Sequence, residues 1–125
     1  MNNKIISQSN SSIEKIDLLK LRAFVLSCRN GTCLANSSTV IYILRSLGER
    51  AELLGMYRIN EDQPFQYLVD SDYGYIDIEM YNDEEDHYDE TRLAPEVDYL
   101  RVLEELRIRR VLTKIHKKIQ QGLFF

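Results

Sequence analysis

A cysteine at the start of an amphipathic segment is the residue of this chain best placed to do chemistry. Cys33 follows Asn30-Gly31-Thr32, which ends one helical pattern and begins the next, so it falls in the first turn of a helix predicted to run to Leu47. The N–H groups and the partial positive charge of a helix N-terminus favour the thiolate, the nucleophilic form of cysteine. Cys33 is therefore a candidate nucleophile. The alternative is a small buried residue at a helix start.

Acyl transfer by a thiolate also needs a base, which passes a proton to the leaving group, and a third group that orients the base. The chain has two histidines, His87 and His116, and none lies between Cys33 and His87. His87 stands in an acidic run, where neighbouring carboxylates favour its protonated form. Because a protonated imidazole cannot accept a proton, His87 is kept only as an alternative base. His116 lies on a basic segment and is expected at the surface.

The segments around and after Cys33 resemble those of the transglutaminase-like cysteine peptidases. The resemblance spans roughly residues 31–79 and is carried by Cys33-Leu34, by Leu44-Arg45 before Gly48, by Ala51-Glu52-Leu53 before Gly55, and by Asp77. Within that superfamily the chain is most similar to the leader peptidases of lasso-peptide biosynthesis, a bacterial-type peptide-processing system. The resemblance implies a papain/transglutaminase-like core. In such a core Cys33 attacks the leader–core peptide bond, a histidine on the next strand is the base, and Asp77 orients that base.

The family's base position holds a glutamine in this chain. The family's strand reads His-x-Trp-x-Glu, and the matching stretch runs from Gln66 to Asp70, with Asp70 in place of the glutamate. A glutamine amide forms hydrogen bonds but does not titrate near neutral pH, so it cannot shuttle a proton. Gln66 would then contact the substrate or an oxyanion, and the base would come from His87, from water or from a partner chain. Asp77 has an alternative interpretation as a strand residue that faces water.

A short series of helices and strands is predicted to position these residues. Ser11 to Glu14 read as a capping box for a first helix that ends near Ser27, and the helix of Cys33 ends at a Gly48 cap. Strands at 51–59, 65–69 and 75–79 have connections too short for crossovers and form an antiparallel meander. The segment 82–94 is an acidic loop, and Pro95 opens a long C-terminal helix over 95–121. The predicted class is α+β, with N-terminal helices packed on the three-stranded meander.

The composition fits one domain over residues 1–125, with its core at 10–80. Hydrophobic residues make up 44% and charged residues 29% of the chain, which excludes a disordered chain and a disulfide-stapled miniprotein. No apolar run approaches the ~18–20 residues of a membrane helix. The first residues carry no apolar stretch of signal-peptide length, so the cytoplasm is the expected compartment. Cys28 and Cys33 are expected to be free thiols, and no metal or cofactor is expected.

The net charge of −4 is unevenly distributed along the chain. Residues 61–98 hold 14 of the 20 acidic side chains and one basic residue, Arg92, whereas residues 101–118 hold seven basic residues and two acidic ones. The simplest interpretation is a solvated acidic loop that a basic helix neutralises. The alternative is a basic docking face for an acidic peptide or a nucleic acid. The acidic balance of the whole chain argues against nucleic acid.

Two functions from different classes follow from these residues. The first is a cysteine acyl-transfer enzyme that cleaves or modifies a peptide, with Cys33, Gln66 and Asp77 in its site. The second is a catalytically inactive member of the same fold that binds a peptide or protein, for example by strand addition along 65–70 if that edge is open. The resemblance adds two expected partners, a precursor peptide and a separate leader-recognition protein. No membrane partner is expected, because the chain has no apolar run of membrane-helix length. Several tyrosines either pack in the sheet or line a peptide groove: Tyr57, Tyr67, Tyr73, Tyr75 and Tyr81.

Overall fold

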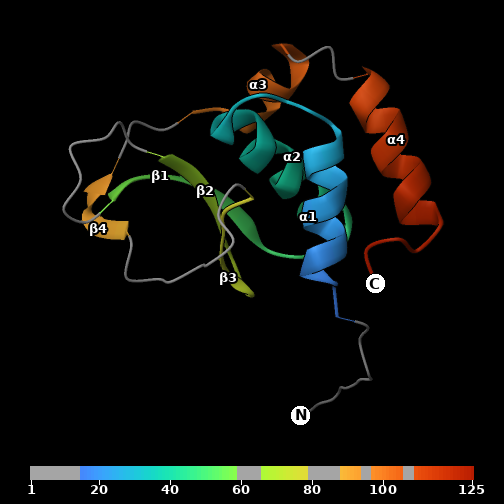
Figure 1. Cartoon of the computed structure of the whole chain (residues 1–125), viewed down its shortest axis with the longest axis horizontal. Coiled ribbons are helices and arrows are strands. Elements are labelled where there is room, and N and C mark those ends of the chain that lie inside the picture. The colour runs from blue at the N-terminus through green and yellow to red at the C-terminus, as the bar shows by residue number, and fades with distance from the viewer. Residues whose placement is uncertain (1–14, 59–65, 79–87, 94–96, 106–108) are drawn as a thin grey trace.

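The computed structural model describes residues 15–58, 66–78, 88–93, 97–105 and 109–125, and within these ranges the chain forms four helices and four strands. The α+β class is confirmed. Figure 1 shows α2 between the strands on one side and α1 with α4 on the other. The helices are α1 (Leu18–Ser27), α2 (Cys33–Ser46), α3 (Tyr99–Glu105) and α4 (Arg109–Gln120). The strands are β1 (Ala51–Arg58), β2 (Gln66–Ser71), β3 (Gly74–Ile76) and β4 (Tyr88–Leu93).

The sheet is antiparallel in the order β3-β2-β1-β4, so the predicted three-stranded meander is confirmed. β1 and β2 pair from Ala51 opposite Ser71 to Met56 opposite Gln66. β2 extends to Ser71, two residues beyond the predicted end, and β3 is shorter than predicted. The Ser71 side chain closes the turn between them, because its Oγ donates to the carbonyl of Gly74 at 2.9 Å.

The prediction of a loop over 82–94 is wrong for its second half, since residues 88–93 form the edge strand β4. β4 pairs with β1 from Met56 opposite Leu93 to Arg58 opposite Tyr88, with a register shift between Met56 and Tyr57. Charged residues are common on edge strands, where they discourage pairing with other chains. The high charge of this segment therefore hid a strand. The remainder of the predicted loop, including His87, lies outside the described residues.

The first helix begins later than the capping-box motif predicts. Ser11 and Glu14 lie outside the described residues, and residues 15–17 are not helical. The N-cap of α1 is Asp17, whose carboxylate accepts hydrogen bonds from the backbone N–H groups of Leu19 and Lys20 at 3.0 and 3.3 Å. The N–H of Asp17 donates to the carbonyl of Phe124 at 2.7 Å. This long-range bond ties residue 17 to the C-terminal segment instead of to a preceding helical turn.

α2 occupies the centre of the molecule and has the predicted limits. Thr32 is its N-cap, and Gly48 follows its end with a φ of +83°, which suits glycine. Nine of its 14 residues are buried, all between Ala35 and Leu44. They pack against β1, β2 and α1 in the main hydrophobic core, to which α4 adds Ile115. A helix buried on this scale holds its N-terminus at a defined place beside the sheet.

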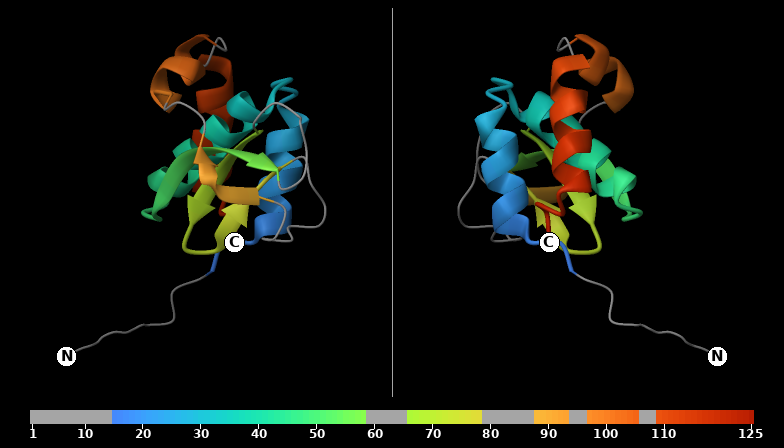
Figure 2. Two further views of the ribbon diagram at one scale, coloured as in Figure 1. Left: turned by 90° about the vertical axis from the view of Figure 1, so that its left-hand side faces the viewer. Right: turned by 90° about the vertical axis from the view of Figure 1, so that its right-hand side faces the viewer.

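The C-terminal region forms two helices, not the single predicted helix over 95–121. Figures 1 and 2 show α3 and α4 running in different directions. Leu103 of α3 and Ile115 of α4 are both buried, at 2% and 0% exposure. In one continuous helix these residues would point about 120° apart, because each residue turns the helix by about 100°. Two helices allow both side chains to reach the core.

β2 is an interior strand, so the strand addition predicted along 65–70 is excluded at the part that β3 covers. Val69, Asp70 and Ser71 pair with β3 on one side, and β2 pairs with β1 along its whole length on the other. None of the described helices is long and apolar enough to cross a bilayer.

The packing of Phe124 generates a prediction about stability. Its fully buried ring meets Phe24 edge to face at 5.4 Å between centroids. Phe124→Ala is expected to lower the free energy of unfolding by about 3–5 kcal/mol, because it leaves a cavity under α1. Urea unfolding followed by circular dichroism measures the change. Phe125→Ala is the matched control, since Phe125 is 36% exposed and the substitution should change stability by less than ~1 kcal/mol. Equal effects of the two substitutions would contradict this account of the core.

Candidate functional site

Cys33 is the first residue of α2, as predicted. The Thr32 side chain caps the helix by accepting a hydrogen bond from the N–H of Ala35 at 3.1 Å. The Cys33 side chain is partly exposed, and both cysteines are free thiols, as expected. The thiol therefore stands at the positive end of a capped helix.

The Cys33 sulfur contacts the backbone of β2. Its Sγ accepts a hydrogen bond from the N–H of Tyr67 at 3.4 Å, and the hydroxyl of Ser37 donates to the carbonyl of the same residue at 3.1 Å. Cys33 and Ser37 are one helical turn apart, so they lie on one face of α2. One face of the helix thus provides a partner for the backbone N–H and for the backbone carbonyl of Tyr67, at a position that β3 does not cover.

Gln66 and Asp77 are in contact. Gln66 directly precedes Tyr67, and its side-chain Nε2 donates a hydrogen bond to Oδ2 of Asp77. Asp77 follows β3 and is only 4% exposed, so its interpretation as a strand residue that faces water is wrong. The structure thus links Gln66 to Asp77 directly, and links Cys33 to the residue next to Gln66.

The described histidine is remote from Cys33. Nε2 of the exposed His116 lies 2.8 Å from the hydroxyl of Tyr42, and the two rings are 5.8 Å apart. Tyr42 is nine residues after Cys33 on α2, which corresponds to about 13 Å along the helix axis. His116 is therefore bonded to the C-terminal half of α2, away from Cys33. It lies at the surface, as predicted. No group of three or more potential metal-ligating side chains occurs within the described ranges.

Burial changes the acidity of two groups near α1 and α2. Burial raises the pKa of the Cys28 thiol above its usual value, although the nearby Lys114 charge and a hydrogen bond with Ser27 act in the opposite direction. Cys28, the C-cap residue of α1, also donates to the carbonyl of Phe24 at 3.5 Å. Burial likewise raises the pKa of the Tyr67 hydroxyl, and the charge of a Cys33 thiolate would add to this effect.

A cavity of about 490 Å³ opens beside Tyr67, between β1, the end of α2 and the residues before α3. Arg45 is one of its charged lining residues. The Arg45 guanidinium carbon lies 4.8 Å from the centroid of the Tyr99 ring, and its Nε donates to the carbonyl of Ala51 at 2.9 Å. A smaller cavity of about 340 Å³ lies along α3 and shares Val97 with the first. The remaining side of the larger cavity is formed by Glu52, Leu53, Leu54, Gly55, Asp70 and Leu93.

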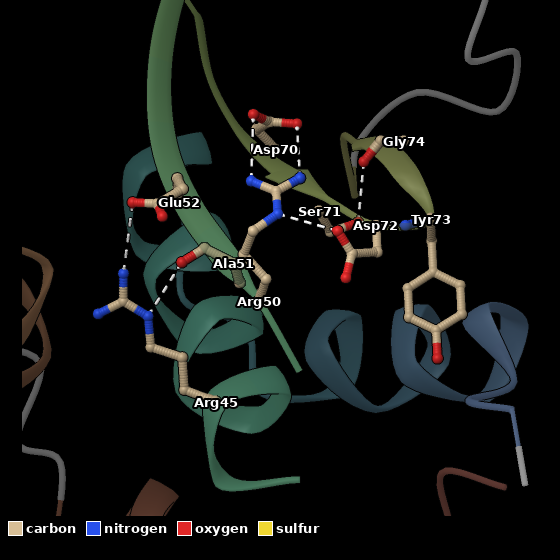
Figure 3. A network of polar contacts seen from close by, with 9 residues as sticks. All are labelled: Arg45, Arg50, Ala51, Glu52, Asp70, Ser71, Asp72, Tyr73 and Gly74. Atoms are coloured by element: carbon tan, nitrogen blue, oxygen red, sulfur yellow. Dashed lines mark hydrogen bonds and ion pairs between the residues drawn. The ribbon is translucent and has the colours of Figure 1, made fainter. Parts of the chain in front are cut away.

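Charged side chains hold the rim of the larger cavity in place (Figure 3). Arg45 reaches Glu52 at 3.7 Å, and Arg50 contacts Asp70 and Asp72 at 3.4 and 2.9 Å. The hydrogen bonds to Asp72 and Asp70 raise the pKa of Arg50. Glu52 and Asp70 lie directly opposite each other on β1 and β2, where like charges repel. One arginine beside each carboxylate offsets this repulsion.

Sequence reasoning missed Arg45 and Tyr99 as lining residues, because they are far apart in the chain and the motif that contains Leu44-Arg45 assigns no binding role to the arginine. Tyr67 is the only one of the described tyrosines predicted for a groove that lines either cavity. Tyr73 packs against the main hydrophobic cluster of the described residues, and Tyr75 packs against the smaller cluster of Met56 and Leu68. The Tyr73 hydroxyl accepts from the N–H of Ile16 at 3.3 Å. Tyr81 lies outside the described residues.

No protein-family model matches the chain, and no curated protein sequence or solved structure matches it either.

Two neighbouring serines of α2 test the contact between α2 and β2. Ser37→Ala removes the donor to the buried Tyr67 carbonyl and is expected to lower the free energy of unfolding by about 1–3 kcal/mol. Ser38→Ala is the matched control, since the Ser38 hydroxyl is buried without a partner among the described residues. Both substitutions raise helix propensity equally, so their difference in urea unfolding isolates the hydrogen bond. If Ser38→Ala destabilised the protein as much as Ser37→Ala, the hydrogen bond from Ser37 to the Tyr67 carbonyl would contribute nothing to the packing of α2 on β2.

Proposed function

We propose that this chain is a non-catalytic peptide-binding protein with a fold of the transglutaminase-like cysteine peptidase type. The observation that carries the proposal is the hydrogen bond from the Gln66 amide to Asp77. Asp77 stands where the resemblance expects the carboxylate that orients a base, and the group it contacts is one that cannot take up a proton near neutral pH.

The surroundings of Cys33 support a structural role for its thiol. The sulfur accepts the Tyr67 N–H and so helps to hold α2 against β2. Cysteine catalysis of acyl transfer needs a proton shuttle beside the sulfur. The described histidine, His116, is bonded to Tyr42 instead. These contacts favour binding over bond cleavage.

The cavity beside Tyr67 supports peptide binding. Its volume of about 490 Å³ lies within the range of roughly 300–1,000 Å³ that is common for ligand sites. It combines apolar side chains such as Leu54 and Val97 with the oriented guanidinium of Arg45, which suits a peptide side chain together with a polar backbone group. The ligand that the resemblance suggests is a precursor peptide, presented together with a separate leader-recognition protein.

An acyl-transfer enzyme remains the second candidate, because one observation favours it. Cys33 is the first residue of a capped helix, where a thiolate is stabilised. The base would then have to come from His87, which lies outside the described residues, from water or from a partner chain. The reactivity of the two thiols separates the two candidates.

Alkylation by iodoacetamide at pH 7, read by mass spectrometry at each cysteine, tests the absence of catalysis. Cys33 is expected to react no faster than free cysteine, because its partly buried sulfur packs against the Tyr67 N–H and the described imidazole, that of His116, is bonded to Tyr42. Cys28 is expected to react more slowly still, because burial raises its pKa. The variants Cys28→Ala and Cys33→Ala assign each rate.

A Cys33 rate more than about tenfold above that of free cysteine would favour the enzyme instead. Gln66→His adds a check on the fold type. With an imidazole beside Asp77, the Cys33 rate should rise if the two side chains face each other as in the resembled family. An unchanged rate would argue against that arrangement.

Peptide binding is tested by selection from a displayed peptide library against the intact chain. Selected peptides are expected to lose most of their affinity for Leu93→Asp, because Leu93 lines the larger cavity and is 59% exposed. Leu100→Asp is the matched control, since Leu100 is 50% exposed and lines neither cavity. Peptides that bind both variants equally well would place the binding surface elsewhere.

A further inference from the structure

The guanidinium of Arg45 is held in one orientation at the wall of the larger cavity. Its Nε donates to the carbonyl of Ala51 at 2.9 Å, and its central carbon lies 4.8 Å from the centroid of the Tyr99 ring. Figure 3 shows the side chain reaching from α2 to the start of β1. One contact is at an edge of the planar group and the other is at a face, so together they define its plane. A guanidinium that is already oriented loses little conformational freedom when it binds a ligand.

The two terminal nitrogens of Arg45 are available to a ligand. Nη2 lies 3.7 Å from Oε1 of Glu52, which is longer than a hydrogen bond. Neither terminal nitrogen is hydrogen-bonded to the described part of the chain. The Glu52 side chain is 58% exposed, and an ion pair with this exposure contributes little because water screens it. The N–H donors of these nitrogens form the fork that matches the two oxygens of a carboxylate.

Apolar side chains line the cavity around this guanidinium. Leu54 and Val97 are partly buried there, and Leu93 is exposed at the same cavity. The volume of about 490 Å³ is in the range of ligand sites, in which apolar walls surround a few oriented polar groups. A ligand that fills the cavity therefore brings apolar atoms to these walls and a polar or charged group to Arg45.

The acidic side chains of the cavity already have cationic neighbours. Asp70 accepts from Nη1 of Arg50 at 3.4 Å, and Glu52 lies beside Arg45. A cationic ligand would have to displace an arginine from one of these carboxylates, and it would meet the like charge of Arg45. A ligand carboxylate would instead take the place of Glu52 beside Arg45 and leave the exposed Glu52 to water. The arrangement of charges therefore favours an anionic group.

We propose that the larger cavity recognises a carboxylate that stands next to an apolar side chain in the bound peptide. This inference rests on the peptide binding proposed above and names its chemistry. Arg45 donates two parallel hydrogen bonds to the carboxylate, while the ring of Tyr99 keeps the guanidinium in place. The neighbouring apolar side chain of the peptide packs against Leu54 and Val97. The carboxylate is either the C-terminus of the peptide or an acidic side chain, since both present the same pair of oxygens.

Small acetylated dipeptides test the proposal on the intact chain. Acetyl-leucyl-leucine presents a terminal carboxylate, and acetyl-leucyl-leucinamide is its neutral match. The amides of acetyl-leucyl-aspartate and acetyl-leucyl-asparagine form the corresponding pair for an acidic side chain. NMR titration is expected to show saturable shifts at Leu54 and Gly55, with at least one acid binding about tenfold more tightly than its neutral match. The pair that shows this preference identifies the source of the carboxylate.

Three variants assign the preference to Arg45. Arg45→Gln is expected to abolish it. Arg101→Gln is the matched control and should retain it, because Arg101 is an arginine in an exposed ion pair with Glu105 that lines only the smaller cavity. Glu52→Gln removes the competing carboxylate and should tighten binding of the acid about two- to fivefold. Loss of folding cannot produce this gain, and urea midpoints check that all three variants are folded.

Several results would overturn the proposal. They are the absence of saturable binding, equal binding of acids and neutral matches, an acid preference that survives Arg45→Gln or is lost in Arg101→Gln, and tighter binding of acetyl-leucyl-lysinamide than of either acid. Library peptides that need Leu93 but bind Arg45→Gln unchanged would overturn the carboxylate alone. A library that yields no Leu93-dependent peptide would instead overturn the peptide binding on which the inference rests.

Discussion

Both polar backbone groups of Tyr67 are bonded to side chains of one helix, and the geometry of the candidate site depends on this contact. Tyr67 pairs with Gly55 of β1, yet its N–H and carbonyl turn to the other side of β2, where β3 reaches only from Val69 onward. A buried backbone group without a partner is costly. Cys33 and Ser37 supply those partners from α2, beyond the part of β2 that β3 covers.

The docking of α2 explains why a cysteine stands where it does. Cys33 is the first residue of α2, and its sulfur also accepts a hydrogen bond from the N–H of Tyr67 in β2. The same position therefore suits both a nucleophile and a residue that packs the helix on the sheet. The neighbouring Gln66 continues the polar chain to Asp77, which is buried behind it. Polar contacts here join α2, β2 and the end of β3. They hold three elements together without requiring any group to change its protonation state.

The surfaces available for partners differ in their chemistry. The cavity at β1 and α3 combines aliphatic walls with arginines and carboxylates that are paired across its rim. The outer face of α1, by contrast, has a narrow row of exposed apolar side chains: Leu19, Ala23 and Leu26.

The sequence by itself determined the elements whose signals are local. Thr32 and Gly48 delimit α2 because a cap satisfies the end of a helix within a few residues, and short connections force the antiparallel meander. Tertiary contacts decided the rest. Asp17 became the N-cap of α1 because its N–H is bonded to the carbonyl of Phe124. β4 formed because β1 offered an edge for pairing. α3 separated from α4 because the buried side chains of Leu103 and Ile115 both reach the core. The contact between Gln66 and Asp77 and the cavity around Arg45 likewise bring together residues from different elements, and such proximity exists only once the strands and α2 have packed.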